Sequence, residues 1–212
     1  ADVFERLEEH GQAELSERFG AERLAPIVSE MAPDDLVDFI DALPEPIGEE
    51  LLEELDPDAA REVAELSAWP DDSAGGLMTT DLIKLSPDLT MTEVVHKLRT
   101  EAEDAETIYY IYAVAKDGTL EGVASLRDII IADPEAKLRE IMNEVVHTVP
   151  PELDQEEVAR LLGKYDFTAM PVVKDKRLLG LITIDDVIDV IEEEVDEDVQ
   201  KLAAVEPIEE AY

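Results

Sequence analysis

The residues of this sequence best able to do chemistry are its carboxylates. Aspartate and glutamate number 55 against 17 lysines and arginines, and the formal net charge at pH 7 is −38. The chain has no cysteine, and its three histidines, His10, His96 and His147, lie far apart in the sequence. Thiolate sites and zinc-spaced histidine pairs are therefore excluded. Any metal must be held by oxygen ligands, and the charge suits cations.

Two pairs of aspartates have the spacing that places side chains on one helix face. Asp34 and Asp38 are four positions apart, and Asp186 and Asp189 are three apart, which is one turn in each case. A structural interpretation stands beside the chemical one. Asp34 suits a helix N-terminus, Asp128 and Asp186 suit helix caps, and most surface carboxylates are simply solvated. An acidic surface also favours solubility in a salt-adapted protein.

Composition and motifs exclude several classes of function. The negative charge repels nucleic acid and anionic membranes. No apolar run approaches the ~18 residues that span a bilayer, so we expect no direct membrane insertion and no signal peptide. The sequence has no P-loop, Gly-x-Ser-x-Gly, His-Glu-x-x-His or dinucleotide fingerprint, which argues against an enzyme. Because the chain starts at Ala1 rather than Met, we expect it to be a soluble piece of a larger protein.

The second two-thirds of the chain contains an internal repeat. Leu77–Leu98 matches Ile141–Leu162 at a constant offset of 64, and Thr107–Ile130 matches Tyr165–Ile188 at an offset of 58. A single insertion, Glu101–Glu106, accounts for the difference. A register held over so many positions predicts two copies of one small unit. Two such copies pack together, and the cleft between them is the expected place for a ligand.

The first third of the chain reads as helices. Apolar residues recur at helical spacing through residues 1–68, and β signals are absent. The tetrapeptide Met31–Asp34 recurs as Leu55–Asp58, each copy with a proline where a first helical turn tolerates it. The pattern predicts short paired helices stacked as a superhelix. Trp69–Ser73 is a polar, proline-containing linker between the helices and the repeated units.

Each repeated unit has the pattern of strand, helix, hairpin and helix. A short strand precedes a proline-containing turn, at Pro87 in one unit and Pro150–Pro151 in the other. An amphipathic helix follows, and then two apolar runs joined by a turn, of which Asp117-Gly118 is a strong hairpin signal. The hairpins and closing helices are expected at Ile108–Ala124 with Leu126–Ile131, and at Thr168–Thr183 with Asp185–Glu194.

One motif occurs in both units and carries a resemblance to a known family. Gly122–Asp128 and Gly180–Asp186 share the pattern Gly-x-x-[Ser/Thr]-x-x-Asp between a strand and a helix. The hydroxyl residue and the aspartate three positions later have capping-box spacing. The doubled motif resembles the CBS domain. CBS units come in pairs, and the resemblance implies a homodimer formed through them.

The order of segments resembles the cytosolic region of MgtE-type magnesium transporters. The matching segments beyond the motif are Asp72–Thr79, Glu106–Tyr112, Lys164–Thr168 and Asp196–Val205. The implied fold class is α+β: an all-α superhelical N-terminal domain, a tandem CBS pair of two βαββα-type units, and the start of a connecting helix. The implied domain limits are 1–70, 77–140, 141–195 and 196–212. The family's membrane domain would follow, which places this region on the cytoplasmic side of the cell membrane.

The resemblance also implies a set of Mg²⁺ ligands between the N-terminal domain, the CBS pair and the connecting helix. They are Asp34, Asp38, Asp154, Glu156, Asp166, Asp186, Asp189, Glu197 and Asp198. Mg²⁺ keeps several waters, so one or two carboxylates per ion are enough. Like charges would hold the acidic surfaces apart when the ion is scarce, and the ion would bring them together. The implied function is a sensor that closes a pore at high Mg²⁺ and releases it at low Mg²⁺.

A second set of residues is implied for an adenine nucleotide such as ATP. CBS clefts often bind nucleotides, and the matching positions are Tyr110, Arg127, Asp128 and Phe167. The alternative interpretation is that Tyr110 and Phe167 are core residues. Two other functions stay open on the sequence: a nucleotide-sensing CBS module that does not respond to metal, and an acidic oligomerisation scaffold.

Overall fold

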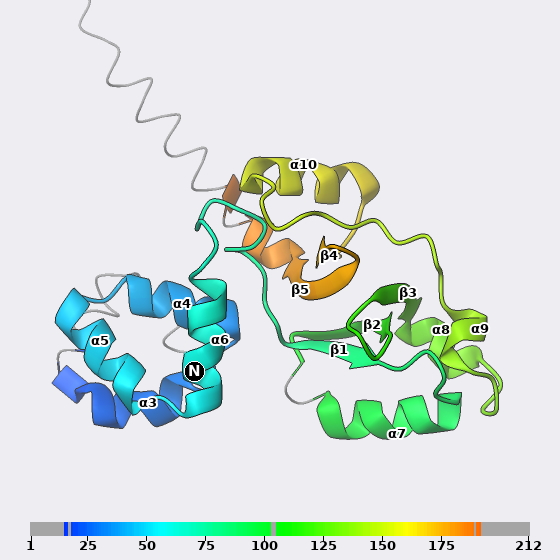
Figure 1. Ribbon diagram of the computed structural model, residues 1–212, viewed down its shortest axis with the longest axis horizontal. Coiled ribbons are helices and arrows are strands. Elements are labelled where there is room, and N and C mark those ends of the chain that lie inside the picture. Colours follow the sequence, from blue (N-terminus) through cyan, green and yellow to red (C-terminus); the bar gives the residue numbers. More distant parts are fainter. Residues whose placement is uncertain (1–14, 17, 103–104, 189, 192–212) are drawn as a thin grey trace, which may run out of the picture.

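The structure is a computed structural model that describes residues 15–16, 18–102, 105–188 and 190–191. The described part of the first third is helical, as the apolar spacing predicts. Its helices are α3 (Ala21–Val28), α4 (Pro33–Asp41), α5 (Glu45–Glu54) and α6 (Pro57–Leu66). They form one helical domain at the side of the molecule (Figure 1).

The helices of this domain pack in alternation. Helix α3 contacts α5, and α4 contacts α6 and, less extensively, α5, so the main contacts join each helix to the next but one. Pro33 and Pro57 occupy first-turn positions of α4 and α6, where the missing amide costs nothing. The two copies of the repeated tetrapeptide therefore begin two helices, α4 and α6, that pack against each other.

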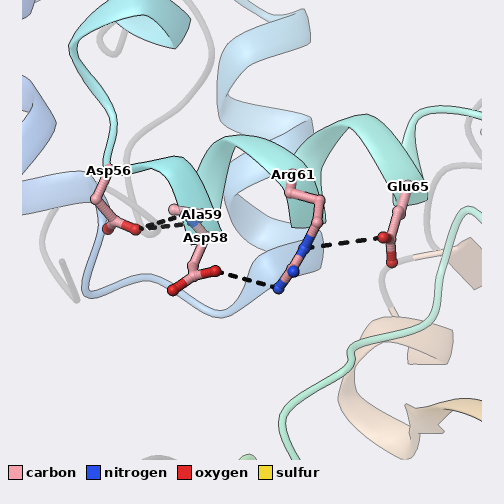
Figure 2. A network of polar contacts seen from close by, with 5 residues as sticks. All are labelled: Asp56, Asp58, Ala59, Arg61 and Glu65. Atoms are coloured by element: carbon pink, nitrogen blue, oxygen red, sulfur yellow. Dashed lines mark hydrogen bonds and ion pairs between the residues drawn. The ribbon is translucent and has the colours of Figure 1, made fainter.

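The start of α6 shows what the aspartates of this domain do locally (Figure 2). Asp56 Oδ1 accepts hydrogen bonds from the amides of Asp58 and Ala59, at 2.9 and 3.1 Å. Such a cap stabilises a helix by about 1 kcal/mol. Arg61 then forms ion pairs with Asp58 and Glu65, at 3.3 and 3.9 Å. Since these pairs are exposed, they contribute little to stability.

The first repeated unit is a three-stranded sheet covered by helices. Its strands are β1 (Leu82–Leu85), β2 (Thr107–Val114) and β3 (Leu120–Ser125), in the order β1-β2-β3. Strand β2 lies parallel to β1 and antiparallel to β3. The helices of the unit are α7 (Met91–Glu101), α8 (Leu126–Ile131) and α9 (Leu138–Ile141). Side chains from all three helices join the core on this sheet.

The second unit has a smaller sheet than the repeat predicts. It contains α10 (Gln155–Tyr165), β4 (Ala169–Lys174) and β5 (Arg177–Thr183), and residues 184–188 and 190–191 are helical. The short strand expected before Pro150–Pro151 is absent from this described segment. A single parallel bridge between Val149 and Val172 takes its place. The two prolines that follow Val149 supply no amide donors, so the pairing does not continue past this residue.

The second half of strand β2 lies between the two units, and both of its faces are buried there. Ile111 and Ala113 lie in the core with α7 and α8. Tyr112 faces the other way and packs with Leu178 and Leu181 of the second unit. The apolar run of β2 is therefore continuous rather than alternating, as expected of a strand covered on both sides.

The segment that precedes each unit pairs with the other unit. We call these two segments arms; the arm of the first unit contains Thr79, and the arm of the second contains Asn143. Thr79 and Leu181 exchange two backbone hydrogen bonds of 2.9 Å, and Asn143 and Val123 exchange two of 2.8 and 3.0 Å. The motif glycines make room for the crossing, because a Cβ on Gly180 would lie 2.6 Å from the Thr79 oxygen. On Gly122 it would lie 2.8 Å from Met142 Sδ. The segments ahead of each unit in the sequence thus lie on its partner unit in space.

The helical domain and the second unit share one hydrophobic core. A contiguous cluster of buried side chains runs from α3–α6 through Ala74 and Met78 to Val158 and Leu162 of α10 and Val187. The helical domain is therefore packed against the second unit in this structure.

Candidate functional site

The most unusual polar group of the structure is the carboxylate of Asp34. It lies in the first turn of α4, beside the second unit. Its Oδ1 atom is covered from solvent and has no hydrogen-bond partner. A buried polar atom left unpaired costs about 1–3 kcal/mol. Such an atom in a packed interface points to an unmet need for a positive or hydrogen-bonding partner.

A second carboxylate from across the interface acts on Asp34. Burial raises the pKa of Asp34 well above its ordinary value, and the negative charges of Asp186 and Asp35 raise the pKa further. A hydrogen bond from the Thr79 side chain acts in the opposite direction. The structure therefore brings together two predicted ligands, Asp34 and Asp186, from elements 152 positions apart in the chain.

Asp186 also has the capping role that its spacing predicts. Its Oδ2 accepts hydrogen bonds from the amide and the hydroxyl of Thr183, at 3.1 and 2.7 Å. The first unit repeats the arrangement, because Asp128 Oδ2 accepts from the amide and hydroxyl of Ser125. The cap fixes where each aspartate lies, and Asp186 also has a charge of the helical domain, that of Asp34, beside it.

The other predicted ligands within the described residues lie on the surface. Asp38 is exposed on α4, one turn after Asp34. Asp154 caps α10 by accepting from the Glu156 amide at 3.0 Å. Asp166 ends the same helix in a left-handed conformation. A helix of 11 residues is about 16 Å long, so Asp154 and Asp166 do not meet.

Three predicted ligands, Asp189, Glu197 and Asp198, lie outside the described residues. Within the described ranges, no three Asp, Glu or His side chains gather closely enough to hold a metal ion. The pair Asp34 and Asp186 still fits part of an Mg²⁺ site, because its donors are carboxylate oxygens and Mg²⁺ fills the rest of its shell with water.

The residues expected to bind a nucleotide form two groups. Tyr110 lies opposite Ser125 in the β2–β3 pair, next to the exposed Arg127 and Asp128 of α8. Phe167 is half-buried and stacks in the second unit. The Phe167 ring centroid lies 5.5 Å from that of Tyr165 and 5.4 Å from that of His147.

Sequence reasoning missed three residues of these sites. His147 and Tyr165 have ring centroids 4.6 Å apart and complete the aromatic cluster around Phe167. Thr79, fully buried, supports Asp34. No motif links aromatic residues so far apart in the chain, and nothing in the spacing of the residues marked Thr79.

Comparisons with known proteins agree with this architecture. Residues 1–72 match the family described as "MgtE intracellular N domain", and residues 74–135 and 138–193 each match "CBS domain". The chain is 45% identical over 210 residues to the magnesium transporter MgtE of Thermus thermophilus, covering 97% of this chain and 47% of the relative. It is 37% identical over 204 residues to MgtE of Bacillus subtilis, covering 96% and 45%.

Two solved structures are similar over most of the chain. The cytosolic domain of the Mg²⁺ channel MgtE in complex with ATP has a TM-score of 0.85 at 45% identity, covering 89% of this chain and 78% of that one. The soluble part of a magnesium transporter has a TM-score of 0.88 at 36% identity, covering 91% and 77%.

The chain spans about half the length of the two curated MgtE relatives. Among its described helices, none has both the length and the apolar character to cross a bilayer. The matches to the N domain and to both CBS units account for the helical domain and the two α/β units described above. The chain belongs to the MgtE family, of which it contains the intracellular N domain and the CBS pair.

Proposed function

We propose that this chain is the Mg²⁺-sensing regulatory region of a magnesium transporter, on the cytoplasmic side of the membrane, and that it is not an enzyme. The observation that supports this function best is the buried, unpaired Asp34 Oδ1 beside Asp186. The relatives are magnesium transporters, and a carboxylate pair across a domain interface is suited to reading a dication.

The mechanism follows from the charges of the two domains. Two unit charges 4 Å apart repel by about 4 kcal/mol at an effective dielectric of 20. Asp34 and Asp186 therefore oppose docking of the helical domain when cations are scarce. Mg²⁺, when bound, supplies positive charge that offsets this repulsion. Each site that binds only in the docked state stabilises that state by RT ln(1 + [Mg²⁺]/Kd), so several weak sites together respond steeply.

The rest of the regulatory assembly is part of the same proposal. Mg²⁺ bound by the predicted ligands Asp189, Glu197 and Asp198 would couple docking of the helical domain to the connecting helix and, through that helix, to the membrane domain. A homodimer through the CBS units fits the exposed isoleucines Ile130 and Ile131 of α8, which are 69% and 73% exposed. In the dimer, docking would hold the pore closed, and release of the helical domain would open it.

Small-angle scattering across a millimolar MgCl₂ titration tests this function. We expect the radius of gyration to fall with MgCl₂ but not with NaCl of matched ionic strength. Equal compaction with both salts would mean general screening of the −38 chain, and no compaction with either would leave a static scaffold.

Binding of an adenine nucleotide is a second candidate function. It is supported by the placement of Tyr110, Arg127 and Asp128 around Ser125, and by the ATP complex of a relative that is 45% identical. Asp128 would hydrogen-bond the ribose, and the exposed Arg127 would lie near the phosphates. Phe167 would stack on the base.

The nucleotide proposal is tested by ATP titration of the Phe167→Ala variant. Base stacking contributes about 1–3 kcal/mol, so we expect ATP affinity to fall roughly five- to 150-fold by calorimetry. Tyr109 is the counterpart of Phe167 in the first unit and is 68% exposed. Tyr109→Ala is thus the matched control and should bind ATP normally. Equal affinities of the two variants would remove Phe167 from the site.

A further inference from the structure

The segment between the helical domain and the first unit, residues 70–79, is built into the second unit. We call it the junction segment. The amides of Ala74 and Gly75 donate to the carbonyls of Leu153 and Pro151, at 2.7 and 2.8 Å. In return the Gln155 amide donates to the carbonyl of Asp72 at 3.0 Å. These bonds attach the junction segment to the loop that leads into α10.

From Ser73 onward the junction segment is also largely buried, and it is internally bonded. Ser73 is 4% exposed, and its hydroxyl donates to the Pro70 carbonyl at 2.6 Å. Ala74, Met78 and Thr79 are almost completely buried. Since Thr79 is paired with β5 as well, the segment is held along its whole length. If the helical domain moves relative to the second unit, the chain must bend before Pro70, in the short stretch after Leu66.

Trp69 is the last residue of this stretch, and its ring contacts a side chain of the second unit. Lys174 Nζ of the second unit lies 4.7 Å from the centroid of the Trp69 ring. The same Nζ is paired with Glu152 Oε1 at 2.5 Å. The ring lies against the backbone of Gly75, where a Cβ would come within 2.5 Å of Trp69 Cγ. Trp69 is therefore held between the junction segment and a cation.

The partners of Trp69 are themselves fixed in the second unit. Lys174 is the last residue of β4, and the turn after it has Asp175 and Lys176 at φ of 52° and 69°. Two such residues make the tight turn that matches the twist of a hairpin. Glu152 lies in the loop that bonds the junction segment, and its pairing with Lys174 lowers the pKa of Glu152. The Lys174 ammonium group is thus positioned by the β4–β5 hairpin.

We propose that Trp69, Lys174 and Glu152 form an interdomain latch. The latch positions the helical domain on the second CBS unit and so sets the Mg²⁺ concentration at which the domain docks. The inference rests on the proposed sensing function for its effect on Mg²⁺ response. The latch contact itself is testable without Mg²⁺. The three residues are positioning residues, because none of them is placed among the metal ligands.

The experiment compares Lys174→Gln with Lys174→Arg and Lys176→Gln. The first removes the cation over the ring, the second keeps a cation that can stack and pair, and the third removes a charge two residues further along the same hairpin. Trp69 is the only tryptophan in the chain, so its fluorescence reports on the latch directly. Cation–π contacts of this kind contribute roughly a two- to five-fold change in an equilibrium constant.

The expected result has two parts. Without Mg²⁺, the indole emission of Lys174→Gln shifts and its quenching by acrylamide rises, while Lys174→Arg and Lys176→Gln match the wild type. In a MgCl₂ titration followed by scattering, the docking constant of Lys174→Gln falls about two- to five-fold, so its midpoint moves to higher Mg²⁺.

Other outcomes separate the latch from the sensor. Unchanged indole emission in Lys174→Gln would overturn the latch, and so would an equal midpoint shift in Lys174→Gln and Lys176→Gln. If the wild type fails to compact with Mg²⁺ while the emission of Lys174→Gln alone shifts, the contact exists but the sensing function fails, and the assigned role in Mg²⁺ response falls with it.

Discussion

Replacing Asp34 with asparagine is expected to let the helical domain dock without Mg²⁺. The amide has nearly the shape of the carboxylate but carries no charge, so the repulsion between Asp34 and Asp186 disappears. The new NH₂ group can also donate to a neighbouring carboxylate oxygen. The radius of gyration of Asp34→Asn without MgCl₂ should therefore approach the Mg²⁺-saturated value of the wild type, with a flatter titration.

Acid should reproduce the effect of this substitution in the wild type. The pKa of Asp34 is raised above its ordinary value of 3.8 in the docked state. A carboxyl group whose pKa is higher in the docked state stabilises that state when it is protonated. This stabilisation is complete below the ordinary pKa and is lost as the pH rises through the raised pKa of the docked state. We therefore expect the Mg²⁺-free wild type to become more compact as the pH falls through the raised pKa of Asp34 toward 3.8. The difference between wild type and Asp34→Asn should shrink over the same range.

Asp58 provides the matched control for Asp34. It holds the same place in the second copy of the helical tetrapeptide, but its side chain is exposed and paired with Arg61. Asp58→Asn removes one negative charge from an equivalent helix start and should leave the Mg²⁺ titration unchanged. If both variants shift it equally, the net charge of the chain matters and the Asp34–Asp186 contact does not.

The architecture could be predicted because its signals are local or repeated. The hairpins follow from turn residues between apolar runs, and the caps at Ser125 and Thr183 follow from an aspartate three positions later. The repeat then predicts a second unit from the first. The strand that the repeat predicts before Pro150–Pro151 is reduced to a single bridge at Val149, and the prolines that follow end the pairing there.

The contacts between parts of the chain could not be predicted in the same way. Nothing in the spacing of Asp34 and Asp186 indicates that they face each other, since helix periodicity relates only near neighbours. The exchange of arms is equally hidden, because Thr79 and Leu181 pair across 102 positions. The family resemblance named both aspartates, but the structure supplies the burial of Asp34 and its support by Thr79.

The crossing of the arms predicts opposite effects of two glycine-to-alanine substitutions. A Cβ on Gly180 would lie 2.6 Å from the backbone oxygen of Thr79 and 2.8 Å from Met78. The arm must therefore move, which costs about 1–3 kcal/mol in a packed core. Gly163 lies in α10 with nothing within 4 Å of its Cβ position, so alanine there should stabilise the helix by about 0.5–1 kcal/mol. Thermal unfolding followed by circular dichroism should show a lower Tm for Gly180→Ala and a higher Tm for Gly163→Ala.

The substitution at Gly180 should also weaken the Mg²⁺ response, because the displaced arm carries Thr79 away from Asp34. We expect the MgCl₂ midpoint of compaction to rise in Gly180→Ala at a temperature where the variant is fully folded. Gly163→Ala, which disturbs neither arm, should keep the wild-type midpoint. A Gly180→Ala protein with lower Tm but an unchanged midpoint would show that the exchanged arm stabilises the CBS pair without positioning the acidic interface. The support of Asp34 would then have to come from α4 alone.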